Sequence, residues 1–374
     1  MKTLYLDDAA TTKVDTKVLK AMLPYFTKKY ANASSSHDLG REARNAVEKA
    51  RIEIAKYIGA KPQEIYFTSG VTEGNNWVFQ GLARTNENKN KKKIIISSIE
   101  HGSTIEVCKF LEREGYKITR IPLNKEGFAD LEFLKRELDS NTLVVSIMHA
   151  NNLFGTIQNI SQIANICKSK EVLFHTDASQ TLGNVHINVN LMQVDLLSAC
   201  AHKIGGPKGI GFLYIRENVK IEPFIFGGGQ QKGMRGGTEN VPGIVGLAAA
   251  LKYKSKPTSR LIILQNMCMQ EIEKFGQVNG SRTHRLPGNV HVSFKGIDSS
   301  TLLAFLSKKK IYVSVGSACN SSRAHEDYVL KAIGLPVDLI KGSIRITLNE
   351  KVTEGDVKHL VKVIKKDLEK IRIK

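Results

Sequence analysis

Short runs of β-branched and other apolar residues alternate along the chain with longer stretches in which apolar residues recur at helical spacing. Two of these longer stretches, residues 40–58 and 160–169, predict helices. The alternation predicts a mostly parallel sheet covered by helices on both faces, which is an α/β fold. The strands that we expect in this sheet lie at residues 64–68, 93–98, 117–121, 143–149, 173–177, 195–199 and 211–215.

The pattern changes at about residue 255. Residues 261–275 predict a helix, and further helices are expected between and after three later strands. Those strands are expected at residues 289–294, 311–315 and 343–348. The combination is typical of a smaller α+β domain. We therefore divide the chain into a large domain, residues 15–254, and a small domain formed by residues 1–14 and 255–374.

The composition is that of an ordinary globular protein: 41% of the 374 residues are hydrophobic and 24% are charged. No apolar run approaches the roughly 18 residues that span a bilayer, and the N-terminus lacks a signal-peptide pattern, so we expect no membrane contact. None of the five cysteines forms a C-x-x-C pair, which disfavours a metal site. Their odd number favours free thiols and a cytoplasmic location.

The net charge of +19 allows two interpretations. One is contact with an acidic partner such as RNA, including a weak contact with tRNA. The other is a lysine-rich surface that interacts only with water. Lysines cluster at residues 89–93 and 358–374, but no aromatic residues alternate with them as a nucleic-acid stacking surface requires. The second interpretation is therefore favoured.

A turn that leads into a helix follows the first predicted strand of the sheet. Residues 68–76 read TSGVTEGNN, and such a turn presents backbone N–H groups to an anion. The alternative is an ordinary helix cap. The segment matches neither the Walker loop nor the G-x-G-x-x-G pattern, which disfavours nucleoside triphosphates and dinucleotides.

Three residues with reactive side chains also lie at strand ends. Lys203 follows strand 195–199 and precedes a glycine-rich loop, and a desolvated lysine is a nucleophile for Schiff-base chemistry. Asp177 ends a strand 26 residues earlier and could pair with a pyridinium nitrogen. His101 follows strand 93–98 and could stack on a flat ring. Each alone is more often structural, but the carboxyl ends of parallel strands share one edge of a sheet.

Taken together, the motifs resemble those of the fold-type I pyridoxal-phosphate (PLP) enzymes of the class V aminotransferase branch, and within it the cysteine desulfurases of the NifS/IscS kind. They follow the family order over nearly the whole chain. The matching motifs are YLDDAATT at 5–12, TSGVTE at 68–73, EH at 100–101, HANN at 149–152, DASQ at 177–180, HK at 202–203, GGGQ at 227–230, RGGTEN at 235–240, GSAC at 316–319 and SIR at 343–345.

The resemblance implies a PLP cofactor carried by Lys203, which would later move the Cα proton of the substrate. Asp177 would pair with the ring nitrogen, Gln180 would bond the phenolic oxygen, and His101 would stack on the ring. Asn152 would contact both cofactor and substrate.

The same resemblance assigns the phosphate contacts to Val71, Thr72, Cys200 and His202. Thr238 would contact the phosphate of the neighbouring subunit, which implies a homodimer.

For the substrate, the resemblance implies L-cysteine, with its carboxylate held by Asn152 and Arg345. The Cys319 thiolate would attack the substrate sulfur and leave L-alanine and a Cys319 persulfide. The sulfur would then pass to an acceptor protein, either an iron–sulfur scaffold or a tRNA-thiolation enzyme.

Several positions depart from the family pattern. Cys200 replaces a serine that donates to the phosphate, and a thiol is a weaker donor. Gly205, Leu153, Phe154 and Asn349 also differ from the usual residues. Two alternative functions stay open: a selenocysteine lyase or cystine C–S lyase, and a weakly active, RNA-associated sulfur-relay protein.

Overall fold

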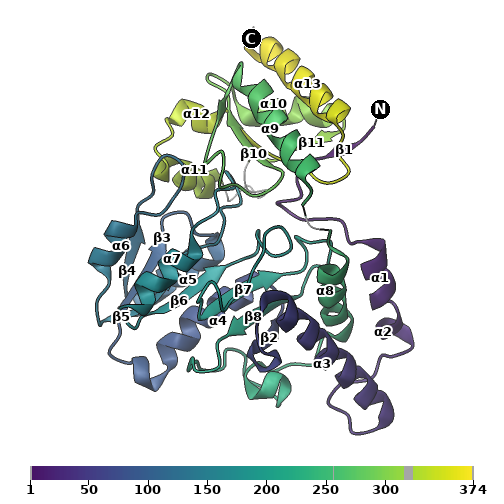
Figure 1. Cartoon of the computed structure of the whole chain (residues 1–374), viewed down its shortest axis with the longest axis vertical. Helices are drawn as coiled ribbons and strands as arrows, with labels where there is room; N and C mark the ends of the chain where they lie inside the picture. The colour runs from purple at the N-terminus through teal and green to yellow at the C-terminus, as the bar shows by residue number, and fades with distance from the viewer. Residues whose placement is uncertain (1, 256, 316–322, 373–374) are drawn as a thin grey trace.

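The computed structural model describes residues 2–255, 257–315 and 323–372. The strands form one seven-stranded sheet and two smaller sheets. Figure 1 shows the large sheet in the lower part of the molecule, with the smaller sheets, the C-terminal helices and both termini above it.

The large sheet has the strand order β2-β8-β7-β6-β5-β3-β4. β8 runs antiparallel to β2 and β7, and the other neighbours are parallel, which confirms the predicted α/β class. The predicted strand 143–149 ends early, although backbone bonds from Ile147 and His149 continue along β6. The strands are β2 (Ile65–Thr68), β3 (Lys93–Ser97), β4 (Lys117–Ile121), β5 (Thr142–Ser146), β6 (Leu173–Asp177), β7 (Leu196–Cys200) and β8 (Gly211–Ile215).

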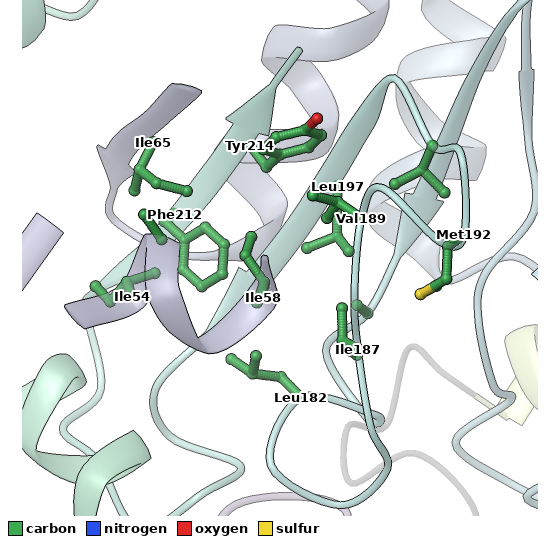
Figure 2. Close-up of a cluster of buried hydrophobic side chains, with 14 of the residues drawn as sticks. Ile54, Ile58, Ile65, Leu182, Ile187, Val189, Met192, Leu197, Phe212 and Tyr214 are labelled. Carbon is green, nitrogen blue, oxygen red and sulfur yellow. The ribbon is translucent and has the colours of Figure 1, made fainter. Parts of the chain in front are cut away.

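Helices cover both faces of this sheet because successive strand residues point to opposite sides. In β3, Ile95 packs into the core on one face, whereas Ile94 and Ile96 pack on the other. The first face carries α1 (Thr16–Met22), α3 (Asp38–Ile58), α6 (Leu131–Glu137), α7 (Ile160–Lys168) and α8 (Val241–Tyr253), and the second carries α4 (Val71–Arg84) and α5 (Gly102–Arg113). Figure 2 shows part of the first core, where Ile54 and Ile58 of α3 lie beside Phe212 of β8.

The smaller sheets combine the C-terminal part of the chain with its N-terminus. β9 (Gln277–Val278), β10 (Asn289–Ser293) and β12 (Ser343–Thr347) form an antiparallel sheet, and β1 (Leu4–Tyr5) pairs in parallel with β11 (Ile311–Tyr312). The helices of this part are α9 (Ser259–Glu273), α10 (Ser299–Lys308), α11 (Arg323–Ala332), α12 (Val337–Lys341) and α13 (Glu354–Arg372). Short helices elsewhere are α2 (Pro24–Thr27), η1 (Pro62–Glu64), η2 (Asn86–Asn88) and η3 (Gln230–Gly233).

None of the helices in the described part of the chain is both long enough and apolar enough to cross a membrane.

Candidate active site

A cavity of about 570 Å³ lies at the carboxyl ends of β6 and β7. This is the edge at which ligands bind in open α/β sheets, and the volume suits a small organic ligand. The cavity brings together ten of the predicted site residues from separate segments of the chain. They are Val71, Thr72, His101, Asn152, Asp177, Gln180, Cys200, His202, Lys203 and Arg345.

Lys203 is held in this cavity by two backbone carbonyl groups of the N-terminal segment. Its Nζ donates to the carbonyl oxygens of Ala9 at 2.5 Å and Ala10 at 2.7 Å. Burial, together with the nearby charge of Arg345, lowers the pKa of Lys203 to about 8. A fraction of the amine is therefore neutral and nucleophilic near neutral pH. The sequence did not predict the role of the two alanine carbonyls.

Asp177 ends β6 and is buried, with its carboxylate fixed by two donors. Its Oδ1 accepts from the backbone N–H of Ser179 at 2.9 Å, and its Oδ2 accepts from Asn75 Nδ2 at 3.1 Å. Asn75 lies in α4 and its Nδ2 also contacts Ser103 Oγ and Thr104 Oγ1, whereas its own Oδ1 is buried without a partner. Sequence reasoning missed this anchoring residue, although it lies within the segment 68–76.

His101 is the N-cap residue of α5, and its ring is exposed to the cavity. Its Nδ1 accepts from the backbone N–H of Ser103 at 3.2 Å and lies 2.9 Å from Ser103 Oγ. The cavity walls desolvate the ring, which lowers the pKa of His101. The neutral ring therefore carries its proton on Nε2, the nitrogen opposite the helix contact.

The N-terminus of α4 opens into the same cavity. Its N-cap residue is Gly70, which has no side chain to cap the helix, so the first turn can offer its N–H groups to an anion. The Glu73 carboxylate stabilises this turn. It accepts from the backbone N–H of Ser69 at 2.8 Å, and from Nε and Nη2 of Arg235 at 2.8 and 3.0 Å.

Two further residues follow β7 on the way to Lys203. Cys200 is buried, which raises the pKa of its thiol to about 12, so it stays protonated. His202 Nδ1 lies 3.1 Å from Thr11 Oγ1, and burial with the charges of Lys203 and Lys208 lowers the pKa of His202 to about 4. Gly205 has a φ of +82°, a left-handed conformation that explains a glycine at this departure from the family pattern.

Arg345 reaches the cavity from β12 and is almost fully buried, at 2% exposed. Its Nη1 donates to the backbone oxygen of Asn152 at 3.2 Å, and its Nη2 donates to Asp7 Oδ1 at 2.7 Å. A planar guanidinium held in this way can bind a carboxylate in bidentate fashion. The Asp7 contact was not predicted from the sequence.

Two predicted site residues are not among the described residues that line the cavity. Thr238 is exposed on the loop before α8, and Cys319 lies outside the described residues. Among the departures, Leu153 and Phe154 are buried in a separate apolar cluster with α11 and do not line the cavity. Asn349 donates to the backbone oxygen of Tyr5 at 3.4 Å.

The donors and acceptors of the cavity fit PLP. A helix N-terminus suits the phosphate, a buried carboxylate suits a protonated ring nitrogen, and an amine with a lowered pKa suits an aldehyde. The orphaned Asn75 Oδ1 beside Asp177 marks a polar position that a ligand or water could satisfy.

Known proteins resemble this chain in sequence and in fold. The family model described as aminotransferase class-V matches residues 4–360. A protein named cysteine desulfurase IscS from Dictyoglomus turgidum is 45% identical over 376 residues, which cover 99% of this chain and 95% of that protein. A solved structure titled NifS-like protein has a TM-score of 0.92 at 39% identity and covers 98% of this chain and 100% of its own. Another solved structure, titled SspA in complex with cysteine, has a TM-score of 0.83 at 36% identity and covers 92% of this chain and 99% of its own.

Proposed function

The chain belongs to the aminotransferase class-V family, and from this premise we propose that it is a PLP-dependent cysteine desulfurase, which converts L-cysteine into L-alanine and transfers the sulfur. The observation that carries the proposal is that the Lys203 amine lies in one cavity with the Asp177 carboxylate. Because its pKa is lowered to about 8, this amine is a nucleophile near neutral pH. The names of the relatives supply the substrate: one is a cysteine desulfurase, and another was solved with cysteine.

Asp177 would keep the ring nitrogen of the cofactor protonated, and Gln180, whose Nε2 donates to Ala9 O at 3.1 Å, would lie near the ring oxygen. When bound, the protonated ring withdraws electrons from the substrate and makes its Cα proton acidic. The phosphate would be held at the N-terminus of α4 by Val71, Thr72, Cys200 and His202.

Lys203 is suited to move the Cα proton, because an amine with a pKa of about 8 both accepts and returns a proton near neutral pH. His101 is neutral in the same range and lines the same cavity. Arg345 and Asn152 would hold the substrate carboxylate, and their mutual contact at 3.2 Å fixes their spacing.

The Cys319 thiolate would attack the sulfur of the bound substrate. An S–S bond forms as the Cβ–S bond breaks, and the electron pair left on carbon takes up a proton to give L-alanine. Cys319 then carries a persulfide, whose outer sulfur passes to the thiol of an acceptor protein. An iron–sulfur scaffold or a tRNA-thiolation enzyme would receive it, and the charge of +19 would favour a weak contact with tRNA.

The protein would act as a homodimer in the cytoplasm. Thr238 and Phe226, which is 75% exposed, lie at either end of a glycine-rich loop that a second subunit would cover. The four cysteines of the described part of the chain are free thiols, as a reducing compartment favours.

The test is incubation of the purified protein with L-cysteine and a thiol reductant. Alanine and sulfide should appear in equal amounts, and mass spectrometry without reductant should find one extra sulfur on the peptide that contains Cys319. Cys319→Ala should abolish desulfuration, whereas a lyase that needs no protein thiol would survive this substitution. Failure of the wild-type protein to release alanine would refute the proposal.

A further inference from the structure

The guanidinium of Arg345 is a buried charge that needs a partner, and the N-terminal segment supplies it. A charge that is 2% exposed is costly unless an opposite charge and hydrogen bonds compensate it. Asp7 accepts from Nη2 at 2.7 Å and is itself 16% exposed, so water screens the pair little.

The three nitrogens of the guanidinium differ in their protein contacts. Nη2 is bonded to Asp7 and Nη1 to the backbone of Asn152, whereas Nε is buried and has no partner. Because Arg345 lines the cavity, a ligand carboxylate could accept from the remaining N–H groups of the guanidinium while Nη1 and Nη2 keep their protein contacts.

The backbone around Asp7 is fixed to the strand that carries Arg345. Asp7 forms a parallel bridge with Thr347, two residues after Arg345, and the backbone N–H of Thr347 donates to Leu6 O at 2.7 Å. Residues that are two apart on a strand share a face. Asp7 is therefore presented to the guanidinium by the strand pairing itself.

The same N-terminal segment also contacts the reactive amine. The carbonyl groups of Ala9 and Ala10 accept from Lys203 Nζ, two and three residues after the carboxylate that holds Arg345. One short stretch of backbone therefore contacts the amine that would carry the cofactor and, through Asp7, the guanidinium that would bind the substrate carboxylate.

We propose that Asp7 is a positioning residue, which fixes the guanidinium of Arg345 at the wall of the cavity, where it binds the α-carboxylate of the substrate. This inference rests on the proposed function for the identity of the substrate. It places the contribution of Asp7 to carboxylate binding in its contact with Arg345.

Two variants separate the charge from the hydrogen bond. Asp7→Ala removes both, and should raise the KM for L-cysteine by roughly tenfold to a hundredfold with little change in kcat. Asp7→Asn keeps an acceptor oxygen and should recover part of this loss. The matched control is Asp8→Asn in the same segment, because the Asp8 carboxyl faces Asn349 and Lys254. The KM of the Asp8→Asn variant for L-cysteine should stay within about twofold of the wild-type value.

Binding is measured independently of turnover by calorimetry of the holoenzyme with L-alanine. The Kd for L-alanine should rise in Asp7→Ala by the same factor as the KM for L-cysteine. This binding measurement does not depend on turnover. If the wild-type enzyme released no alanine from L-cysteine, only the proposed function would be refuted. In an Arg345→Ala background, Asp7→Ala should not change the Kd for L-alanine further.

Three results would overturn the inference. A lower Kd in Asp7→Ala would show that Asp7 competes with the ligand carboxylate. An undiminished effect in the Arg345→Ala background would show that Asp7 acts by another route. A fall in kcat with KM and Kd unchanged would place Asp7 outside carboxylate binding.

Discussion

Replacing Lys203 with methionine should change how the stability of the apoprotein depends on pH. Burial lowers the pKa of Lys203 from 10.5 to about 8 in the folded chain. Between these two values the unfolded chain binds more protons than the folded one, so stability rises with pH in this window. Below pH 8 both states are protonated, and the full cost of burying the charge, about 3 kcal/mol, is present.

The magnitude follows from the two pKa values. Between pH 7 and pH 9.5 the wild-type apoprotein should gain about 2 kcal/mol of unfolding free energy relative to Lys203→Met, which carries no charge at this position. Urea unfolding of both proteins at several pH values measures the difference between their unfolding free energies. The other titrating groups are the same in both proteins, so their contributions cancel in this difference. Lys49→Met, at an exposed position on α3, is the control and should run parallel to wild type. Parallel curves for wild type and Lys203→Met would show that the amine is not desolvated.

Three further substitutions test other parts of the site. Asn75→Ala should lower the unfolding free energy by about 1–3 kcal/mol and speed the loss of PLP, because Asp177 and two hydroxyls lose a buried donor. The absorbance of PLP measures its release, and the control Gln80→Ala in the same helix should leave that release unchanged. Phe154→Ala should cost about 3–5 kcal/mol in urea unfolding while the KM for L-cysteine stays constant, since this ring packs in a core outside the cavity. Cys200→Ser should slow PLP dissociation by up to about tenfold, because a hydroxyl donates better than a thiol; faster dissociation would show that Cys200 does not face the phosphate.

The fold and most of the site were predictable because they follow from rules that act locally along the chain. Apolar runs predicted the strands of the large sheet, and parallel strands bring their carboxyl ends to one edge. Asp177 and Lys203 lie at that edge for this reason. The antiparallel direction of β8 was not predicted, because residues 211–215 are apolar and buried in either direction.

The supporting contacts were not predictable, because they join segments that are distant in sequence. Asn75 looks like any polar helix residue until α4 packs against the end of β6 and brings it to Asp177. Asp7 lies 338 positions from Arg345, and only the bridge between the N-terminal segment and β12 brings them together. The alanine carbonyls that hold Lys203 carry no side-chain signal at all.

The measurement that tests the central claim most directly is borohydride reduction of the purified holoenzyme, followed by peptide mapping. The reduced cofactor should be attached to the peptide that contains Lys203 and to no other lysine. Attachment elsewhere, or a protein that loses its cofactor on dialysis after reduction, would contradict the claim that the buried amine at the end of β7 is the nucleophile.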